Sequence, residues 1–150
     1  KIEDMMNTVF RQISFFKFER KIHEERINGE LTEEDISNIW MKTQEENFGN
    51  SVRFTKEYKY FWAYIPHFIH SPFYVYAYAF GDCLVNSLYS KYREGYKDFN
   101  LKYLELLKSG GTIPYCKLLK EFELDPEKKD FWQMGMNLIK NLMVDLEQLG

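Results

Sequence analysis

The stretch IPHFIHSPFYVYAYAFGD, Ile65 to Asp82, decides the fold of this chain. Its three tyrosines alternate, as the side chains on one face of a β-strand do: Tyr74, Tyr76 and Tyr78. Beyond the stretch, apolar and aromatic residues continue at four-residue steps: Leu84, Leu88 and Tyr92. Spacing and length of this kind are typical of a helix, and proline is favoured in a first helical turn. The sequence therefore predicts a helix from Pro72 to about Arg93.

A helix separates the tyrosines that a strand would align. At about 100° per residue, Tyr74 and Tyr78 lie on one face, one turn apart, and Tyr76 points roughly the other way. His67 and His70 precede the helix in an extended lead-in, because residues before proline favour extended geometry. The residues alone leave two interpretations open. These are aromatic side chains of the core whose hydroxyls find local partners, or phenol and imidazole donors placed to stabilise an oxyanion.

Helical patterns also run through the other long segments of the chain. They cover residues 2–28, 32–48, 99–109, a short segment from Pro114 and a final one that follows Asp125. Thr32 is expected to cap the second helix together with Asp35. Residues 52–71 have no sustained period, so an ordered, aromatic-rich loop is expected there. The predicted fold is all-α, with about six helices and no strand.

Length, composition and charge exclude several classes of function. A length of 150 residues suits one domain or part of one. The net charge is −3 with no basic stripe, which argues against a nucleic-acid partner. The longest apolar run, Pro72 to Phe80, is far shorter than the roughly 20 residues that a membrane span needs. Cys83 and Cys116 have no metal-ligand spacing, and we expect two reduced thiols in a cytoplasmic protein.

No metal site is expected in this chain. The segment HEERI, His23 to Ile27, resembles the start of a zinc-binding HExxH helix, but Ile27 stands where the second histidine is required. No other grouping of His, Asp and Glu has zinc-ligand spacing. A charged, solvated helix end is the better interpretation of this segment. The sequence contains no motif for a nucleophile either.

The His–Tyr stretch resembles the C-terminal region of the oligoendopeptidase F family of zinc metallopeptidases, which are relatives of thimet oligopeptidase. Further segments resemble the same family in the same order: VFRQISFFKFER (Val9–Arg20), FGNSV (Phe48–Val52), YLELLKSGG (Tyr103–Gly111) and FWQMGMNLI (Phe131–Ile139). The resemblance thus covers nearly the whole chain. It implies an almost wholly helical fold with a deep channel and an enzyme that cleaves short peptides.

The resemblance also implies which part of the peptidase this chain is. The family binds zinc through the two histidines of HExxH and a glutamate on a following helix, and these would precede Lys1. Residues 1–150 are therefore expected to be the C-terminal helical part of the catalytic domain. Without zinc ligands, the isolated chain is predicted to be inactive. Its expected partners are short peptides and the upstream, zinc-bearing half of the same protein.

The resemblance assigns roles to five residues of the stretch. His67 and Tyr78 match the family's catalytic histidine and principal tyrosine, which bind the peptide and stabilise the oxyanion. Tyr74, His70 and Tyr76 are the candidates for substrate binding. Removal of one oxyanion donor typically costs about 10²–10³ in rate.

Two other functions remain open beside the peptidase. One is a non-catalytic helical module that binds a peptide or protein through the aromatic loop. The other is a complementing subunit that assembles with a separate zinc-bearing chain. In the isolated chain, the aromatic loop would leave an exposed apolar patch, through which a homodimer could form.

Overall fold

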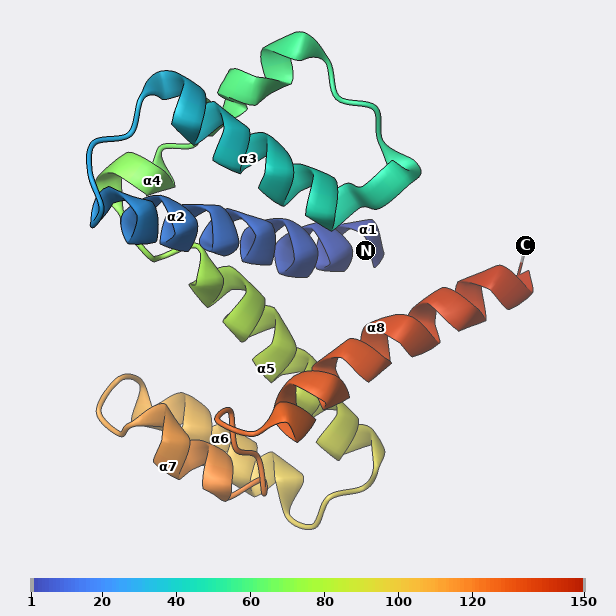
Figure 1. The fold of residues 1–150 in the computed structure, drawn as a ribbon. Helices are drawn as coiled ribbons and strands as arrows, with labels where there is room; N and C mark the ends of the chain where they lie inside the picture. The colour runs from blue at the N-terminus through green and yellow to red at the C-terminus, as the bar shows by residue number, and fades with distance from the viewer. Residues whose placement is uncertain (1, 150) are drawn as a thin grey trace. The chain divides into compact units, whose positions relative to one another are not determined.

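The computed structural model describes residues 2–149, which form helices joined by short connections (Figure 1). Those residues contain no strand, so the prediction of an all-α fold is confirmed. The elements in chain order are α1 (Ile2–Met6), η1 (Asn7–Arg11), α2 (Gln12–Arg26), α3 (Glu33–Phe48), η2 (Gly49–Ser51), η3 (Lys56–Tyr64), α4 (His67–His70), α5 (Tyr76–Arg93), α6 (Phe99–Ser109), α7 (Tyr115–Lys120) and α8 (Lys129–Leu149).

The chain forms two compact units. The N-terminal unit is Met6–Ala79, and the C-terminal unit consists of the described residues before Met6 and those from Phe80 on. The first turn of α5 belongs to the N-terminal unit and the rest of that helix to the C-terminal unit. All five residues that the sequence singles out lie between positions 67 and 78, so the candidate site can be described within the N-terminal unit alone.

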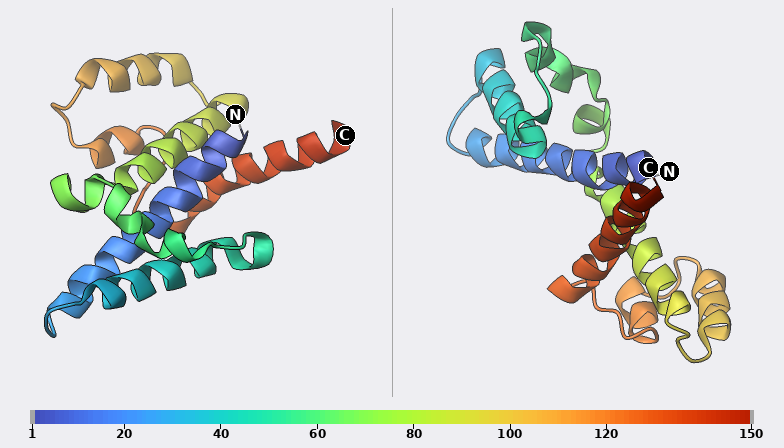
Figure 2. Two further views of the ribbon diagram at one scale, coloured as in Figure 1. Left: turned by 90° about the horizontal axis from the view of Figure 1, so that it is seen from above. Right: turned by 90° about the vertical axis from the view of Figure 1, so that its right-hand side faces the viewer.

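Helices α2 and α3 form the frame of the N-terminal unit and lie side by side (Figures 1 and 2). The start of α3 is fixed by a reciprocal cap. The Thr32 hydroxyl accepts a hydrogen bond from the Asp35 amide at 3.2 Å, and the Asp35 carboxylate accepts one from the Thr32 amide at 2.9 Å. The predicted cap is therefore confirmed, and both amides that the helix start would leave without partners are bonded.

The core of the N-terminal unit is aromatic. Trp40 of α3 is completely buried, and its ring lies 5.6 Å from that of Phe15 and 5.2 Å from that of Phe18, both on α2. Ile65 and Val75 belong to the same buried cluster. Because these two residues bracket positions 66–74, the core holds both ends of the segment that carries His67 and Tyr74.

The segment expected to be an irregular loop is more regular than the sequence predicts. Residues 56–64 form the 3₁₀-helix η3, and α4 follows almost at once. The extended lead-in expected at His67 and His70 is wrong, because these two residues are the first and last of the helical turn α4. With three residues per turn, positions three apart lie on one face of the helix. This period differs from those of a strand and an α-helix, so neither pattern predicts it. Four rings follow one another from Phe54 into η3, with neighbouring centroids 4.7, 5.4 and 5.5 Å apart; the first two pairs are stacked and the last is tilted: Phe54, Tyr58, Phe61 and Tyr64. We call this set the aromatic ladder.

Helix α5 begins at Tyr76, four residues later than the predicted start at Pro72. The reason is Phe73, whose φ of 59° lies in the left-handed region and cannot continue a right-handed helix. Tyr74 therefore precedes α5, while Tyr78 lies in its first turn. The end of the helix at Arg93 agrees with the prediction.

In the C-terminal unit, the later part of α5 crosses α8 closely. A Cβ atom at Gly135 would lie 3.1 Å from the Cα and carbonyl oxygen of Cys83. Nearby, the buried Ser87 hydroxyl donates a hydrogen bond to the Phe131 carbonyl at 3.1 Å. The absence of a side chain at Gly135 thus permits the close approach of the two helices.

Candidate functional site: a histidine and two tyrosines

The site is centred on a hydrogen bond between His67 and Tyr78. The Nε2 atom of His67, at the start of α4, lies 3.1 Å from the Oη atom of Tyr78, in the first turn of α5. Either group can donate, because the tautomer of the imidazole decides which atom carries the proton. The structure thus joins the two residues that the resemblance pairs.

Tyr74 completes the group. Its ring is nearly parallel to the His67 imidazole, at 6.3 Å between centroids, and meets the Tyr78 ring edge to face at 5.5 Å. We call His67, Tyr74 and Tyr78 the His–Tyr trio. Tyr74 and Tyr78 are 52% and 40% exposed, and His67 is half-buried. A ligand can therefore reach these polar groups without any rearrangement of the core.

The local fold explains why three residues spread over twelve positions meet. After α4, the Tyr74 amide donates to the Ser71 carbonyl at 3.1 Å, which closes a turn. Phe68 lies on the side of α4 that faces the core, and its ring centroid is 5.6 Å from that of Phe15 and 5.0 Å from that of Phe18. Anchoring α4 through Phe68 leaves His67 directed towards the first turn of α5.

The turn between α4 and α5 is held from α2. The Phe73 amide donates to the Oε1 atom of Glu19 at 2.7 Å, across 54 positions of sequence. Glu19 is only 3% exposed. Glu19 is absent from the residues predicted for the site, although the sequence carries one signal of its burial. Glu19 lies four positions after Phe15 and one after Phe18, so an acid occupies the buried face of an amphipathic helix.

The other two candidate residues lie outside the trio. Tyr76 faces α2, and its ring is 6.0 Å from that of Phe16. His70, the last residue of α4, is exposed, and among the described residues its side chain makes no recorded contact with the trio. The separation of Tyr76 from Tyr74 and Tyr78 agrees with the predicted faces. The proposed roles of His70 and Tyr76 in substrate binding stay predictions.

The aromatic ladder ends three residues before His67. Tyr58 is partly buried, and burial raises the pKa of its hydroxyl, which donates to Gln44 Oε1 at 3.4 Å. Exposure increases along the ladder, and Tyr64 is 79% exposed. The sequence predicts an aromatic loop here but not the order of the ring contacts, because the contacts among Tyr58, Phe61 and Tyr64 depend on the 3₁₀ period.

The chain offers no metal centre in the part that the structure describes. No group of three or more His, Cys, Asp or Glu side chains there could hold a metal ion. His23, from the HEERI segment, instead contacts the Phe73 ring at 4.6 Å. The described residues therefore do not fit the zinc ion that the family resemblance implies.

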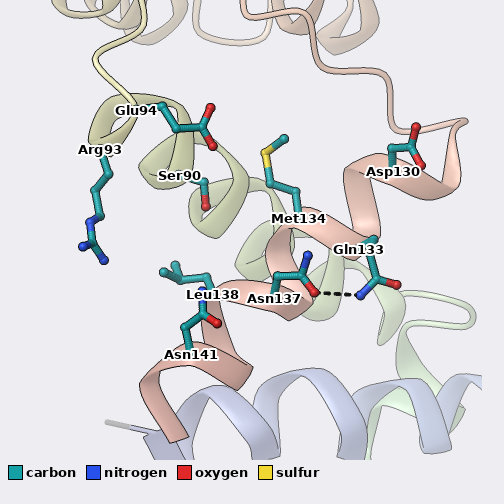
Figure 3. Close-up of a pocket in the computed structure, with 9 residues that line it drawn as sticks. All are labelled: Ser90, Arg93, Glu94, Asp130, Gln133, Met134, Asn137, Leu138 and Asn141. Carbon is teal, nitrogen blue, oxygen red and sulfur yellow. Dashed lines mark hydrogen bonds between the residues drawn. The ribbon is translucent and has the colours of Figure 1, made fainter. Parts of the chain in front are cut away.

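A cavity of about 660 Å³ lies in the C-terminal unit, between α5 and α8 (Figure 3). Its lining mixes polar side chains with Met134 and Leu138, and Gln133 donates a hydrogen bond to Asn137 at 2.9 Å. None of the five candidate residues lines it. We place the candidate site at the His–Tyr trio because convergent, accessible donors are found there.

Over residues 2–149, no helix is both long enough and apolar enough to cross a bilayer.

Comparison with known proteins identifies the relatives of the chain. The sequence model of peptidase family M3 matches residues 1–138. The plasmid-encoded oligoendopeptidase F of Lactococcus lactis subsp. cremoris is 34% identical over 149 residues, which cover 99% of this chain and 25% of that protein. Oligopeptidase PepF of Bacillus subtilis (strain 168) is 30% identical, with 99% of this chain and 22% of that protein covered.

A solved structure agrees with these sequence matches. The crystal structure of oligoendopeptidase-F from Enterococcus faecium matches with a TM-score of 0.90 and 28% identity, over 99% of this chain and 28% of that one. The chain thus spans about a quarter of the length of the relatives it matches.

Proposed function

The chain belongs to peptidase family M3, and on that premise we propose that it is the C-terminal helical part of a zinc-dependent oligoendopeptidase of the cytoplasm that hydrolyses short peptides. The matched relatives are named oligopeptidases, and the chain matches only about a quarter of their length. In this proposal a zinc-bearing segment outside residues 1–150 would hold the metal, which would supply polarisation of the scissile carbonyl and activation of water. The partners of this chain are that segment and the peptide.

The observation that carries the proposal is the bond between His67 Nε2 and Tyr78 Oη. When His67 Nε2 is protonated, it donates to the Tyr78 oxygen, and the Tyr78 hydroxyl proton is then free for another acceptor. The acceptor is the carbonyl oxygen of the scissile peptide, which becomes negative as the tetrahedral intermediate forms. A donor held in place before charge develops stabilises the transition state more than the substrate.

Tyr74 has a different role in this proposal. Its ring lies beside the pair and the residue is exposed, so its hydroxyl can bind a peptide oxygen away from the scissile bond. Its ring, parallel to the His67 imidazole, limits the orientations that the imidazole can adopt. Loss of the Tyr74 hydroxyl should therefore affect substrate binding more than the chemical step.

The proposal is tested by Tyr78→Phe in the peptidase that contains this chain. We expect kcat to fall about 10²-fold or more with little change in KM, because only a transition-state hydrogen bond is lost. Tyr89→Phe is the matched control, since Tyr89 is an exposed tyrosine later on the same helix. An unchanged kcat in Tyr78→Phe would remove this hydroxyl from the mechanism.

The aromatic ladder favours a second candidate function, a non-catalytic module that binds peptides. Exposed rings such as Phe61 and Tyr64 provide binding surface at little cost in side-chain entropy. The two functions differ in one observable. A peptidase that contains this chain cleaves a short peptide and releases two products, whereas a binding module returns the peptide intact.

A further inference from the structure

Glu19 is a buried acid with no counterpart of opposite charge among its recorded contacts. The residue is 3% exposed and lies on the buried face of α2. One carboxylate oxygen accepts the Phe73 amide at 2.7 Å, and the other, Oε2, has no hydrogen-bond partner in the described structure. Burial of a charged group with one oxygen unpaired is unfavourable, so the retained bond to Phe73 calls for an explanation.

The partner of Glu19 is in an unusual conformation. Phe73 has a φ of 59°, a region that is strained for a residue with a bulky side chain. Its ring is 40% exposed, so packing into the core does not account for this conformation. Two hydrogen bonds hold the backbone there: the turn bond from the Tyr74 amide to the Ser71 carbonyl, which spans Phe73, and the short bond from the Phe73 amide to Glu19.

The position of Phe73 gives this bond consequences for the site. The core fixes the chain at Ile65 and again at Val75, which are 5% and 1% exposed. Between these two anchors lie the turn and Phe73, and on either side of Phe73 lie His67 and Tyr74. A change of the Phe73 dihedral angles would therefore redirect Tyr74 and alter the approach of α4 to the first turn of α5.

We propose that Glu19 is a positioning residue: by holding the Phe73 amide, its carboxylate keeps the turn between α4 and α5 in the conformation that brings His67, Tyr74 and Tyr78 together. Its importance for catalysis rests on the proposed function of the trio, but its effect on the geometry does not. Glu19 touches no reacting atom and acts only through Phe73.

The test uses two substitutions at position 19 of the 150-residue protein. In Glu19→Gln, the amide oxygen can still accept the Phe73 amide and the NH₂ group replaces the unpaired Oε2. In Glu19→Leu, the volume is similar but the acceptor is lost. The readouts are hydrogen exchange of the Phe73 amide and the NMR signals of the His67 and Tyr78 rings, neither of which requires a substrate.

We expect Glu19→Gln to preserve both readouts. Glu19→Leu should lower the exchange protection of the Phe73 amide about tenfold or more and shift the His67 ring signals, as its bond to Tyr78 is disrupted. Adding Phe73→Gly to Glu19→Leu should restore the His67 signals, because glycine adopts positive φ without strain. His23→Ala is the control: it removes a contact to the Phe73 ring at 4.6 Å but leaves the amide bond in place.

Three outcomes would overturn the proposal. The first is a Glu19→Leu protein that folds with unchanged His67 and Tyr78 signals. The second is a Glu19→Gln protein as strongly affected as Glu19→Leu. The third is failure of both Glu19→Leu and its combination with Phe73→Gly to fold, which would make the carboxylate a general requirement of the core.

Activity separates this proposal from the proposed function. In the peptidase that contains the chain, Glu19→Leu should lower kcat about tenfold or more, and Phe73→Gly should recover part of it. If the NMR effects appear but no variant of the trio alters kcat, the positioning role stands and the proposed function fails. If Tyr78→Phe lowers kcat and Glu19→Leu changes neither readout, the proposed function stands and the positioning role of Glu19 fails.

Discussion

Cys83 and Cys116 are both free thiols with different surroundings. Cys83 is almost completely buried, and burial, with a smaller contribution from the charge of Asp82, raises the pKa of its thiol to about 11. The thiolate is the reactive form, so near pH 8 only about a thousandth of Cys83 is reactive even where reagent reaches it. We predict that iodoacetamide labels Cys116 in the folded protein and leaves Cys83 unmodified.

Mass spectrometry of the labelled peptides checks this prediction. Labelling in denaturant supplies the control, because both thiols should then react. Equal labelling of the two cysteines under native conditions would show that the contact between α5 and α8 opens readily.

Single residues also show what the sequence can predict about the site. Tyr74 and Tyr78 are expected to be neighbours from helical spacing, and the structure places their rings 5.5 Å apart. Tyr74 nevertheless lies outside the helix, because Phe73 takes a left-handed conformation that no local pattern announces. The carboxylate that accepts the Phe73 amide comes from Glu19, 54 positions earlier. Local periodicity cannot predict a contact between residues so far apart in the sequence.

Two helical glycines lead to opposite predictions at the scale of elements. Replacement of Gly135 by Ala would place a methyl group 3.1 Å from backbone atoms of Cys83, so α5 and α8 must separate. We expect the free energy of unfolding to fall by about 1–3 kcal/mol, as overpacking of a core typically costs. Urea unfolding monitored by circular dichroism measures the change.

Gly81→Ala provides the matched control in α5. Apart from its chain neighbours and the backbone of its own helix, no heavy atom lies within 4 Å of a Cβ at that position. The backbone of Gly81 is helical. The same substitution there should raise the free energy of unfolding by about 0.5–1 kcal/mol, because alanine has the higher helix propensity. A loss of stability in both variants would contradict the close contact at Gly135.

The cap of α3 makes stability depend on pH. Hydrogen bonds from the Thr32 hydroxyl and amide lower the pKa of the Asp35 carboxyl below its ordinary value of 3.8. The stabilisation is therefore complete above pH 3.8 and is lost as the pH falls through the lower pKa of the folded protein. Asp35→Asn should destabilise the protein near neutral pH and much less in acid. A pH-independent difference in unfolding free energy between the two proteins would exclude this mechanism.

Elements with a period of 3.6 residues and a clear cap are predicted well from the sequence, and α3 is an example. The start of α5 and the whole of η3 are not. Proline at position 72 is a valid start signal, but Phe73 has a positive φ one residue later, and α5 begins only at Tyr76. In η3 the helix has three residues per turn, and its contacts with α3 are tertiary: the Trp40 indole donates to the Tyr58 carbonyl and the Trp62 indole to the Ser37 hydroxyl.

For the molecule as a whole, we predict that the 150-residue chain does not hydrolyse peptides, with or without added zinc. The part that the structure describes contains no group of three or more potential metal ligands, and the proposed function places the water-activating zinc outside residues 1–150. Incubation of the chain with a short fluorogenic peptide and zinc tests this. Zinc-dependent cleavage by the purified chain would contradict it.

Recovery of activity gives the complementary measurement. If a separately produced, zinc-bearing N-terminal part of a family M3 peptidase gains activity when mixed with this chain, the His–Tyr trio supplies the missing function. The same mixture with Tyr78→Phe should then remain inactive or nearly so.

For the whole molecule, the resemblance to a known family predicts more than helical periodicity does. Helical periodicity gave the all-α class, and the ordered matches from Val9 to Ile139 gave the family, which the comparisons confirm. The division of the chain into two compact units had no counterpart in the sequence. The boundary falls inside α5, where the helical pattern continues and composition does not change.

The aromatic ladder constrains which changes of length the segment before His67 can accept. Tyr58, Phe61 and Tyr64 share a face of η3 only because they are three residues apart. One inserted residue would rotate every later ring by about 120°, whereas three would add a turn and keep the rings in phase. Insertions and deletions in this segment are therefore expected to be tolerated in multiples of three residues, because only these keep the later rings on the same face of the helix.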